Sequence, residues 1–374
     1  MDYYILGNSG LRVSQLALGT MTFGDDWGWG ADDSVSRQIF DAYLEAGGNF
    51  FDSADMYTNG RSEAMLGKFI KDAGARDKAI IATKFSYSAE PGNPNAGGNS
   101  RKNIMRAVEG SLQRLGTEYI DLYILHTWDG LTPAEEVMRT FDDLVSSGKV
   151  RYVGLSDVPA WYAAEAQVTA RFRGYEPITS IQMEYSLIER SIENEFVDLG
   201  AAHGMGITVW SPLASGLLSG KYKPSAGQLP EGEGRLITTA DSGNPAFEKF
   251  TDRNWAIVAE LEKVARELDR SMAQVALNWV ATQPGVASVL IGATKLHQLQ
   301  DNLAALDFAI PADLRSRLDA AGAMPKPFPY SFFGPELQGM LSGGATVGDK
   351  PSGYYRDKTV RSAGAGVGAN VANA

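Results

Sequence analysis

The chain has 374 residues, of which 44% are hydrophobic, a formal net charge of -11 and no cysteine. This length suits two small domains or one α/β barrel, and an acidic chain without a long Lys/Arg run argues against a nucleic-acid partner. The absence of cysteine excludes disulfide frameworks, thiolate nucleophiles and Cys-ligated metal sites. Because the N-terminus has no signal-peptide pattern and no stretch approaches a membrane span, the sequence predicts a cytoplasmic protein with no membrane partner.

Eight short apolar segments alternate with helical patterns along the chain. Before the first of them, the turn residues 7–10 predict a small N-terminal β-hairpin. The eight predicted strands are residues 16–20, 49–53, 79–83, 121–125, 150–155, 180–183, 206–209 and 288–291. Alternation of strand and helix predicts a parallel sheet, and eight such units favour a closed (β/α)8 barrel, the TIM barrel of the α/β class, with long loops at its C-terminal face.

Helix starts and long loops complete this prediction. Ser62 is the expected N-cap of the helix after the second strand, a helix is expected from about Ser100, and Ser271 has capping-box spacing to Gln274. The non-periodic stretch 227–234, in the long interval before the last strand, is a candidate lid. We expect residues 1–340 to form a single barrel domain and the Gly/Ala-rich residues 341–374 to form a mobile tail.

Ionisable side chains occur at the ends of successive predicted strands. Asp52 lies at the end of the second strand, Lys84 follows the third, His126 follows the fourth, and Tyr57 lies on the loop after Asp52. A barrel brings such positions to one face. Each has a plainer explanation, namely a turn residue, a solvated strand end or a scaffold histidine.

Taken together, the four side chains form a proton-transfer group. A lysine stabilises the phenolate of a neighbouring tyrosine, a carboxylate keeps that lysine charged, and a histidine orients a carbonyl. The set lacks a nucleophile primed for acyl transfer, and the acidic residues lack the grouping of a metal cage. The remaining chemistry is delivery of a proton to an oxygen, which a carbonyl reduction requires once a hydride from a cofactor has reached the carbon.

These four residues belong to a longer series of motifs that resembles the aldo-keto reductase family. The motifs are LGTMTFG at 18–24, LTPAEEV at 131–137, GKVRYVGLSD at 148–157, SPLASGLLSGKY at 211–222 and IGATKLHQLQDNL at 291–303. The resemblance implies a barrel that binds a nicotinamide cofactor, usually NADPH/NADP+, and reduces an aldehyde or ketone to the alcohol. It also implies that Tyr57 is the general acid, that Asp52 and Lys84 tune it, and that His126 orients the carbonyl.

The resemblance also implies a cofactor site. It matches Ser156 and Gln182 to residues that hold the carboxamide, and Trp210 to the ring that stacks on the nicotinamide. The other matched positions are Gly19, Thr20, Met21, Asp52, Asp157, Ser211, Leu213, Gly216, Lys221, Gly292, Ala293, Thr294, Lys295, Gln298, Asp301 and Asn302. Three departures stand out: Asp157 where the family commonly has Asn, Trp210 where Tyr is frequent, and Thr294-Lys295 where relatives often have arginine. Lys295 is then the cation available to a 2′-phosphate, so NADH stays possible beside NADPH.

Aromatic residues suggest the substrate. On the loops of the expected catalytic face these are Phe23, Trp27, Trp29 and Trp128, and Phe332 and Phe333 lie where the family's C-terminal loop closes the pocket. They favour an apolar or ring-bearing small-molecule carbonyl compound, with core packing as the plainer alternative.

Two other functions stay open. One is an NADP(H)-binding barrel that senses redox state or regulates a partner with slow turnover, as the family's potassium-channel β-subunits suggest, and the other is a non-redox barrel enzyme.

Overall fold

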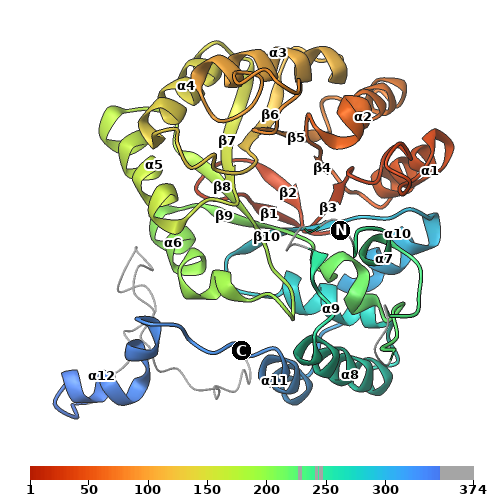
Figure 1. The fold of residues 1–374 in the computed structure, drawn as a ribbon, viewed down its shortest axis with the longest axis vertical. Helices are drawn as coiled ribbons and strands as arrows, with labels where there is room; N and C mark the ends of the chain where they lie inside the picture. The colour runs from red at the N-terminus through yellow and green to blue at the C-terminus, as the bar shows by residue number, and fades with distance from the viewer. Residues whose placement is uncertain (226–229, 241–242, 244–246, 346–374) are drawn as a thin grey trace, which may run out of the picture.

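Eight parallel strands close into a barrel in the computed structural model, which describes residues 1–225, 230–240, 243 and 247–345 (Figure 1). Around the barrel the order is β10-β3-β4-β5-β6-β7-β8-β9. The bounds are β3 Leu16–Gly19, β4 Phe50–Asp52, β5 Ile80–Phe85, β6 Ile120–Leu125, β7 Val150–Ser156, β8 Ile178–Glu184, β9 Gly206–Trp210 and β10 Val286–Ile291. The predicted (β/α)8 barrel is confirmed, and each predicted strand overlaps an observed one.

Helices surround the barrel as an outer layer (Figure 1). Their bounds are α1 Asp33–Glu45, α2 Arg61–Asp72, α3 Arg101–Leu115, α4 Ala134–Ser146, α5 Ala160–Arg173, α6 Phe196–His203, α7 Arg235–Thr238, α8 Asp252–Glu267, α9 Met272–Ala281, α10 Leu296–Leu303, α11 Ala312–Ala321 and α12 Pro335–Leu341. The larger apolar core fills the space between these helices and the strands, where Tyr43 and Trp279 are wholly buried. No helix in the described part of the chain is both long and apolar enough to cross a membrane.

Side-chain alternation along the strands brings polar groups into the barrel mouth. Phe51 packs outward in the larger core, whereas Phe50 packs in a smaller cluster inside the barrel. Because successive strand residues face opposite sides, Asp52 shares the inner side with Phe50. In the parallel register Asp52 pairs with Ala82 of β5, and Lys84 lies two residues further along that strand. The carboxylate and the ammonium group therefore meet at the C-terminal end of the barrel.

Local capping explains where several helices begin. Ser100 accepts a hydrogen bond from the Asn103 N–H at the start of α3, and Ser271 forms the predicted capping box with Gln274 at α9. The prediction that Ser62 is the N-cap of α2 is wrong. Helix α2 begins after Gly60, and the Ser62 hydroxyl instead donates to the Thr20 carbonyl oxygen at 2.7 Å, because it lies inside the first turn and faces the barrel.

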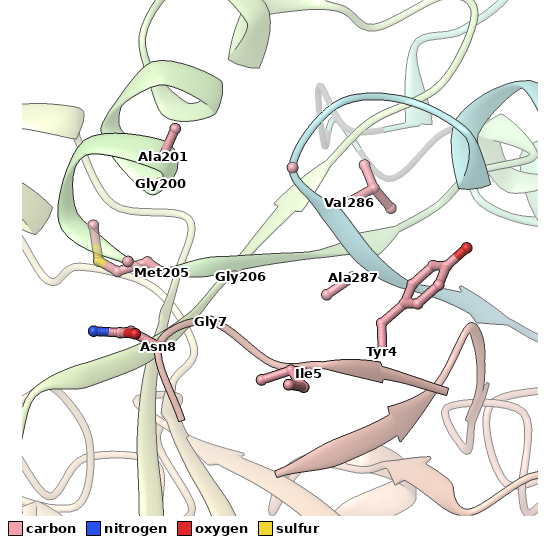
Figure 2. Close-up of a pocket in the computed structure, with 12 residues that line it drawn as sticks. Tyr4, Ile5, Gly7, Asn8, Gly200, Ala201, Met205, Gly206, Val286 and Ala287 are labelled. Carbon is pink, nitrogen blue, oxygen red and sulfur yellow. The ribbon is translucent and has the colours of Figure 1, made fainter. Parts of the chain in front are cut away.

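The predicted hairpin covers the opposite end of the barrel. It consists of β1 Tyr3–Ile5 and β2 Arg12–Ser14, paired antiparallel. Its turn packs tightly, since a Cβ at Gly7 would lie 2.3 Å from the Thr179 carbonyl oxygen and the Gly7 φ is +56°. Figure 2 shows a hollow between this turn and the first residues of β9 and β10, lined by Tyr4, Met205 and Val286 among others. The hollow is thus at the N-terminal ends of the strands, away from Asp52 and Lys84.

The C-terminal segment extends away from the barrel in Figure 1. Phe332 and Phe333, on the short helix η7 Tyr330–Phe333, are 55% and 52% exposed, and their ring contacts are with Phe328 and Tyr330 of the same segment. The prediction that these two rings line the substrate pocket is therefore wrong for this structure. The predicted mobile tail lies outside the described residues from residue 346 onward.

Candidate active site

A buried lysine connects the predicted catalytic residues. The Lys84 side chain is 0% exposed, and its Nζ donates to Asp52 Oδ1 at 2.5 Å, to the Ser53 carbonyl oxygen at 2.8 Å and to the Tyr57 hydroxyl at 3.4 Å. Asp52 comes from the end of β4, and Tyr57 begins the short helix η1 Tyr57–Gly60. The sequence-predicted set therefore meets around one ammonium group.

The charges in this group are fixed by burial and by the ion pair. Burial is the largest single influence on Lys84 and alone would lower its pKa, but the Asp52 carboxylate and the Tyr57 side chain together outweigh it, so the pKa is raised. Burial also raises the pKa of Tyr57, an effect that the Lys84 charge opposes without cancelling. Tyr57 is accordingly a neutral acid at neutral pH, with a cation beside it that stabilises the phenolate formed when its proton leaves.

His126 lies on the other side of the tyrosine. Its ring makes an edge contact with Tyr57 at 5.9 Å between centroids, and a second with Tyr87 at 5.1 Å. Burial, reinforced by the Lys84 charge, holds the pKa of His126 well below its usual range, so the imidazole is neutral. Its Nδ1 is buried without a hydrogen-bond partner among the described residues. A neutral imidazole in this position can donate one hydrogen bond to a substrate oxygen. Tyr87 has no strand-end or motif signal, and sequence reasoning missed it.

The residues matched to the carboxamide cluster next to this group. Gln182 of β8 donates from Nε2 to Asp52 Oδ2 at 2.8 Å, which leaves its Oε1 available as an acceptor. Asp157 Oδ1 accepts from the Trp210 indole N–H at 3.1 Å. The Ser156 hydroxyl is buried beside the Asp157 carboxyl, yet it makes no well-formed hydrogen bond to any residue that the structure describes. A buried hydroxyl and a free amide oxygen beside an indole ring suit a planar amide ligand, so these residues fit a nicotinamide.

The loop after β9 holds two cations. Lys221 passes between Gly216 and Gly234, where any Cβ would collide with its side chain. Arg235, at the start of α7, lies with its guanidinium 4.2 Å from the centroid of the Trp29 ring. Among the described residues neither cation has a carboxylate partner. Burial lowers the pKa of Lys221, with repulsion from Arg235 adding to the effect, and burial lowers the pKa of Arg235. An exposed lysine and a half-buried arginine, neither with a counter-charge among the described residues, can together bind an anion.

Arg235 is a functional candidate that sequence reasoning missed. Its charge acts on Tyr57 and lowers the pKa of that phenol, against the larger effect of burial. The sequence offered only a single arginine after a glycine in a stretch without periodicity. Residues 227–229 of the candidate lid lie outside the described residues, and Arg235 follows the part of the lid that is described.

The predicted adenosine end lies between β10 and α10. The Thr294 N–H donates to Gln298 Oε1 at 2.9 Å, which shapes the turn into the helix. Lys295 precedes α10, is exposed and forms no ion pair in the described part of the chain. Asp301 accepts hydrogen bonds from Ser271 and Gln274 and therefore ties α10 to α9.

The remaining matched positions line the strand ends around these groups. Gly19 is the last residue of β3, Thr20 and Met21 follow it, and the Thr20 hydroxyl donates to the Asp52 carbonyl oxygen at 3.1 Å. Ser211 and Leu213 follow β9, Gly292 and Ala293 follow β10, and Asn302 donates to the Gly292 carbonyl oxygen at 3.3 Å.

The predicted substrate residues separate into two groups. Trp27 and Trp29 contact each other with ring centroids 5.5 Å apart and are half-buried on the loop after β3. Trp128 packs against Trp161 of α5. Phe23 is wholly buried against Phe69 in the main core, so its prediction as a pocket wall is wrong. The Trp27–Trp29 pair is the aromatic surface that adjoins Arg235.

Comparisons with known proteins show which proteins the chain resembles. A model of the aldo/keto reductase family matches residues 15–323. A probable voltage-gated potassium channel subunit beta from Oryza sativa subsp. japonica is 39% identical over 311 residues, which cover 82% of this chain and 92% of the relative. The aryl-alcohol dehydrogenase [NADP(+)] of Phanerodontia chrysosporium is 33% identical, over 87% of this chain and 86% of the relative. Norsolorinic acid reductase of Aspergillus flavus is 31% identical, over 87% of this chain and 82% of the relative.

Proposed function

Because this chain belongs to the aldo/keto reductase family, we propose that it reduces an aldehyde or ketone to the alcohol with a hydride from NADPH and a proton from Tyr57. Family membership implies carbonyl reduction that depends on a nicotinamide cofactor. The observation that carries the finer proposal is the wholly buried Lys84 ammonium, which connects the Asp52 carboxylate to the Tyr57 hydroxyl.

The side chains of the site divide the chemistry among them. When bound, a reduced nicotinamide supplies the hydride that forms the new C–H bond. Tyr57 donates its proton to the carbonyl oxygen as that hydride arrives, and Lys84 stabilises the phenolate that results. Asp52 keeps Lys84 charged and in place. The neutral His126 donates a hydrogen bond to the carbonyl oxygen and thereby orients it toward Tyr57.

The cofactor would be held along the strand ends. Ser156, Asp157 and Gln182 would bind the carboxamide, and the Trp210 ring would support the nicotinamide. Lys221 and Arg235 would neutralise the diphosphate, since both are cations without counter-charges among the described residues. At the adenosine end, Lys295 would bind the 2′-phosphate of NADPH, with less geometric selectivity than an arginine fork provides.

We assign an apolar or ring-bearing carbonyl compound as the substrate class. The support is the half-buried Trp27–Trp29 pair, together with the similarity to an aryl-alcohol dehydrogenase, whose name refers to a ring-bearing substrate. Aromatic walls bind flat apolar rings by contact area and ring stacking. A panel of aromatic and aliphatic aldehydes and ketones, followed by the absorbance of NADPH and of NADH, tests the whole proposal. Reduction of no carbonyl compound with either cofactor would contradict it.

A second candidate function is an NADP(H)-binding barrel that regulates a partner and turns over slowly. The 39% identity to a probable potassium channel subunit beta favours it. The two candidates differ in turnover. A rate of many cycles per minute with a good substrate supports the enzyme, whereas single-cycle reduction followed by very slow cofactor release supports the regulatory barrel.

A further inference from the structure

Asp157 occupies a constrained position next to the proposed nicotinamide subsite. It follows the last residue of β7 with a left-handed φ of +46°, and its carbonyl oxygen accepts bonds at 3.4 Å from the Trp128 N–H and from the Thr127 hydroxyl. Its carboxyl oxygen Oδ1 accepts from the Trp210 indole N–H at 3.1 Å. The backbone of Asp157 is therefore fixed by two hydrogen bonds, and its carboxyl group is bonded to the ring proposed to support the nicotinamide.

Charged and titratable groups face this carboxyl from three directions. Glu184 of β8 repels it and is itself paired with Lys249 at 2.8 Å. Lys84 of β5 attracts it. Burial raises the pKa of Tyr87, in the loop after β5, and the negative charge of Asp157 adds to this rise. Burial is the largest influence and raises the pKa of Asp157 to about 7, with Glu184 adding to the rise and the Trp210 hydrogen bond and Lys84 opposing it.

We infer that Asp157 couples proton binding to the oxidation state of the nicotinamide that this chain holds. Ionised, the carboxylate favours the oxidised ring, which is a cation. Protonated, the carboxyl group favours the reduced ring, which is neutral. This inference rests on the proposed function, and it assigns Asp157 the role of a positioning and selectivity residue.

Two physical effects act in the same direction. A negative charge beside a pyridinium ring attracts it, and this attraction is absent for the dihydronicotinamide. A protonated carboxyl group also offers an O–H donor to the carboxamide oxygen, which is more electron-rich in the dihydronicotinamide than in the pyridinium form, whereas a carboxylate can only accept. Raising the pH through the titration of Asp157 should consequently weaken the binding of NADPH relative to the binding of NADP+.

Isothermal titration calorimetry of the whole chain with NADP+ and with NADPH, between about pH 5.5 and about pH 8.5, tests this inference. The ratio of Kd for NADP+ to Kd for NADPH should fall by about tenfold over this range, which corresponds to roughly one pKa unit of coupling. In Asp157→Asn the ratio should be flat. Asp307→Asn is the matched control, because it removes the same charge at an exposed position outside the site and should behave as the parent protein does.

A second variant keeps the test informative if Asp157→Asn folds poorly. Glu184→Gln removes the repelling carboxylate, so the pH at which the ratio changes should move downward while Asp157 is retained. A ratio that does not vary with pH in the parent protein, or one that varies equally in Asp157→Asn, would overturn the inference while leaving the proposed function intact. Failure of both dinucleotides to bind at every pH would overturn both.

Discussion

Replacing Tyr57 by phenylalanine should separate catalysis from stability. The hydroxyl has one hydrogen-bond partner in the described residues, Lys84 Nζ at 3.4 Å, and Lys84 retains its shorter bonds to Asp52 and to the Ser53 carbonyl oxygen without it. The buried ion pair therefore survives in the variant. Loss of one long hydrogen bond should change the free energy of unfolding by less than about 1 kcal/mol.

The cost to carbonyl reduction should be far larger. A general acid contributes about 10²–10⁴-fold to a rate, or about 2.7–5.4 kcal/mol of activation free energy. No other neutral acid in the described site is bonded to Lys84, whose bonds go to Asp52, to Ser53 and to Tyr57. The NADPH dissociation constant should be nearly unchanged, because the hydroxyl supplies a proton and is not among the residues proposed to hold the cofactor.

Single-turnover reduction of a good substrate, with the chain saturated in NADPH, measures the chemical step. Tyr119→Phe is the matched control. That ring lies before β6, at the opposite end of the barrel, beneath the Arg76 and Arg151 guanidinium groups, and its hydroxyl makes no hydrogen bond among the described residues. A Tyr57→Phe rate within about threefold of the parent rate would refute the assignment of Tyr57 as the acid.

Three further outcomes are expected. Burial, reinforced by the Glu63 charge, raises the pKa of Asp55 to about 7. Between about pH 4 and about pH 7 the folded state therefore holds a proton that the unfolded state has released. Because of this, the free energy of unfolding falls as the pH rises through that range. Asp55→Asn should lessen this fall, measured by urea unfolding at several pH values, and an unchanged slope would contradict the reasoning. Lys295→Ala should weaken NADPH binding by about ten- to 150-fold and leave NADH nearly unaffected, measured by titration, whereas equal loss for both cofactors would rule out a 2′-phosphate contact. With NADPH saturating, the single-turnover rates of the parent protein and of Asp157→Asn should be equally flat between about pH 6 and about pH 9, and a slope that Asp157→Asn removes would show that Asp157 also affects proton delivery.

The barrel and the convergence of its polar strand ends were predictable because both follow from local pattern. Eight apolar segments that alternate with helical periodicity favour a closed parallel barrel, which brings Asp52, Lys84 and His126 to one end whatever their separation in sequence. The burial of the Lys84 side chain could not be predicted from the sequence pattern. A strand-end lysine is usually solvated, but this one is wholly buried, because Asp52 and the Ser53 carbonyl oxygen compensate its charge from a neighbouring strand.

The predictions that failed and the residue that was missed have one physical cause, because the role of each side chain depends on contacts with residues distant in sequence. Phe23 is an aromatic residue of the kind that often lines a pocket, but the ring of Phe69 from α2 packs against it. Ser62 is a residue type that often caps helices, but its hydroxyl donates to the carbonyl oxygen of Thr20, which follows the neighbouring strand β3. Arg235 carries no local signal, and its importance appears only when Trp29 and Tyr57 lie beside it. Residue type limits what a side chain can do, and its tertiary neighbours decide which of those roles it has.

The site keeps its proton-transfer charges fixed while leaving one carboxyl group free to titrate. The pKa values of Lys84 and Tyr57 are both raised, and that of His126 is well below its usual range, so none of the three changes charge near neutral pH. Asp55 titrates near pH 7, but its charge acts on Tyr123, behind the barrel wall, and is not among the influences on Tyr57. Asp157 is therefore the group in the described site whose charge would make function depend on pH. Because it touches Trp210 and not Tyr57, that dependence should appear in which form of the cofactor is bound, and not in delivery of the proton.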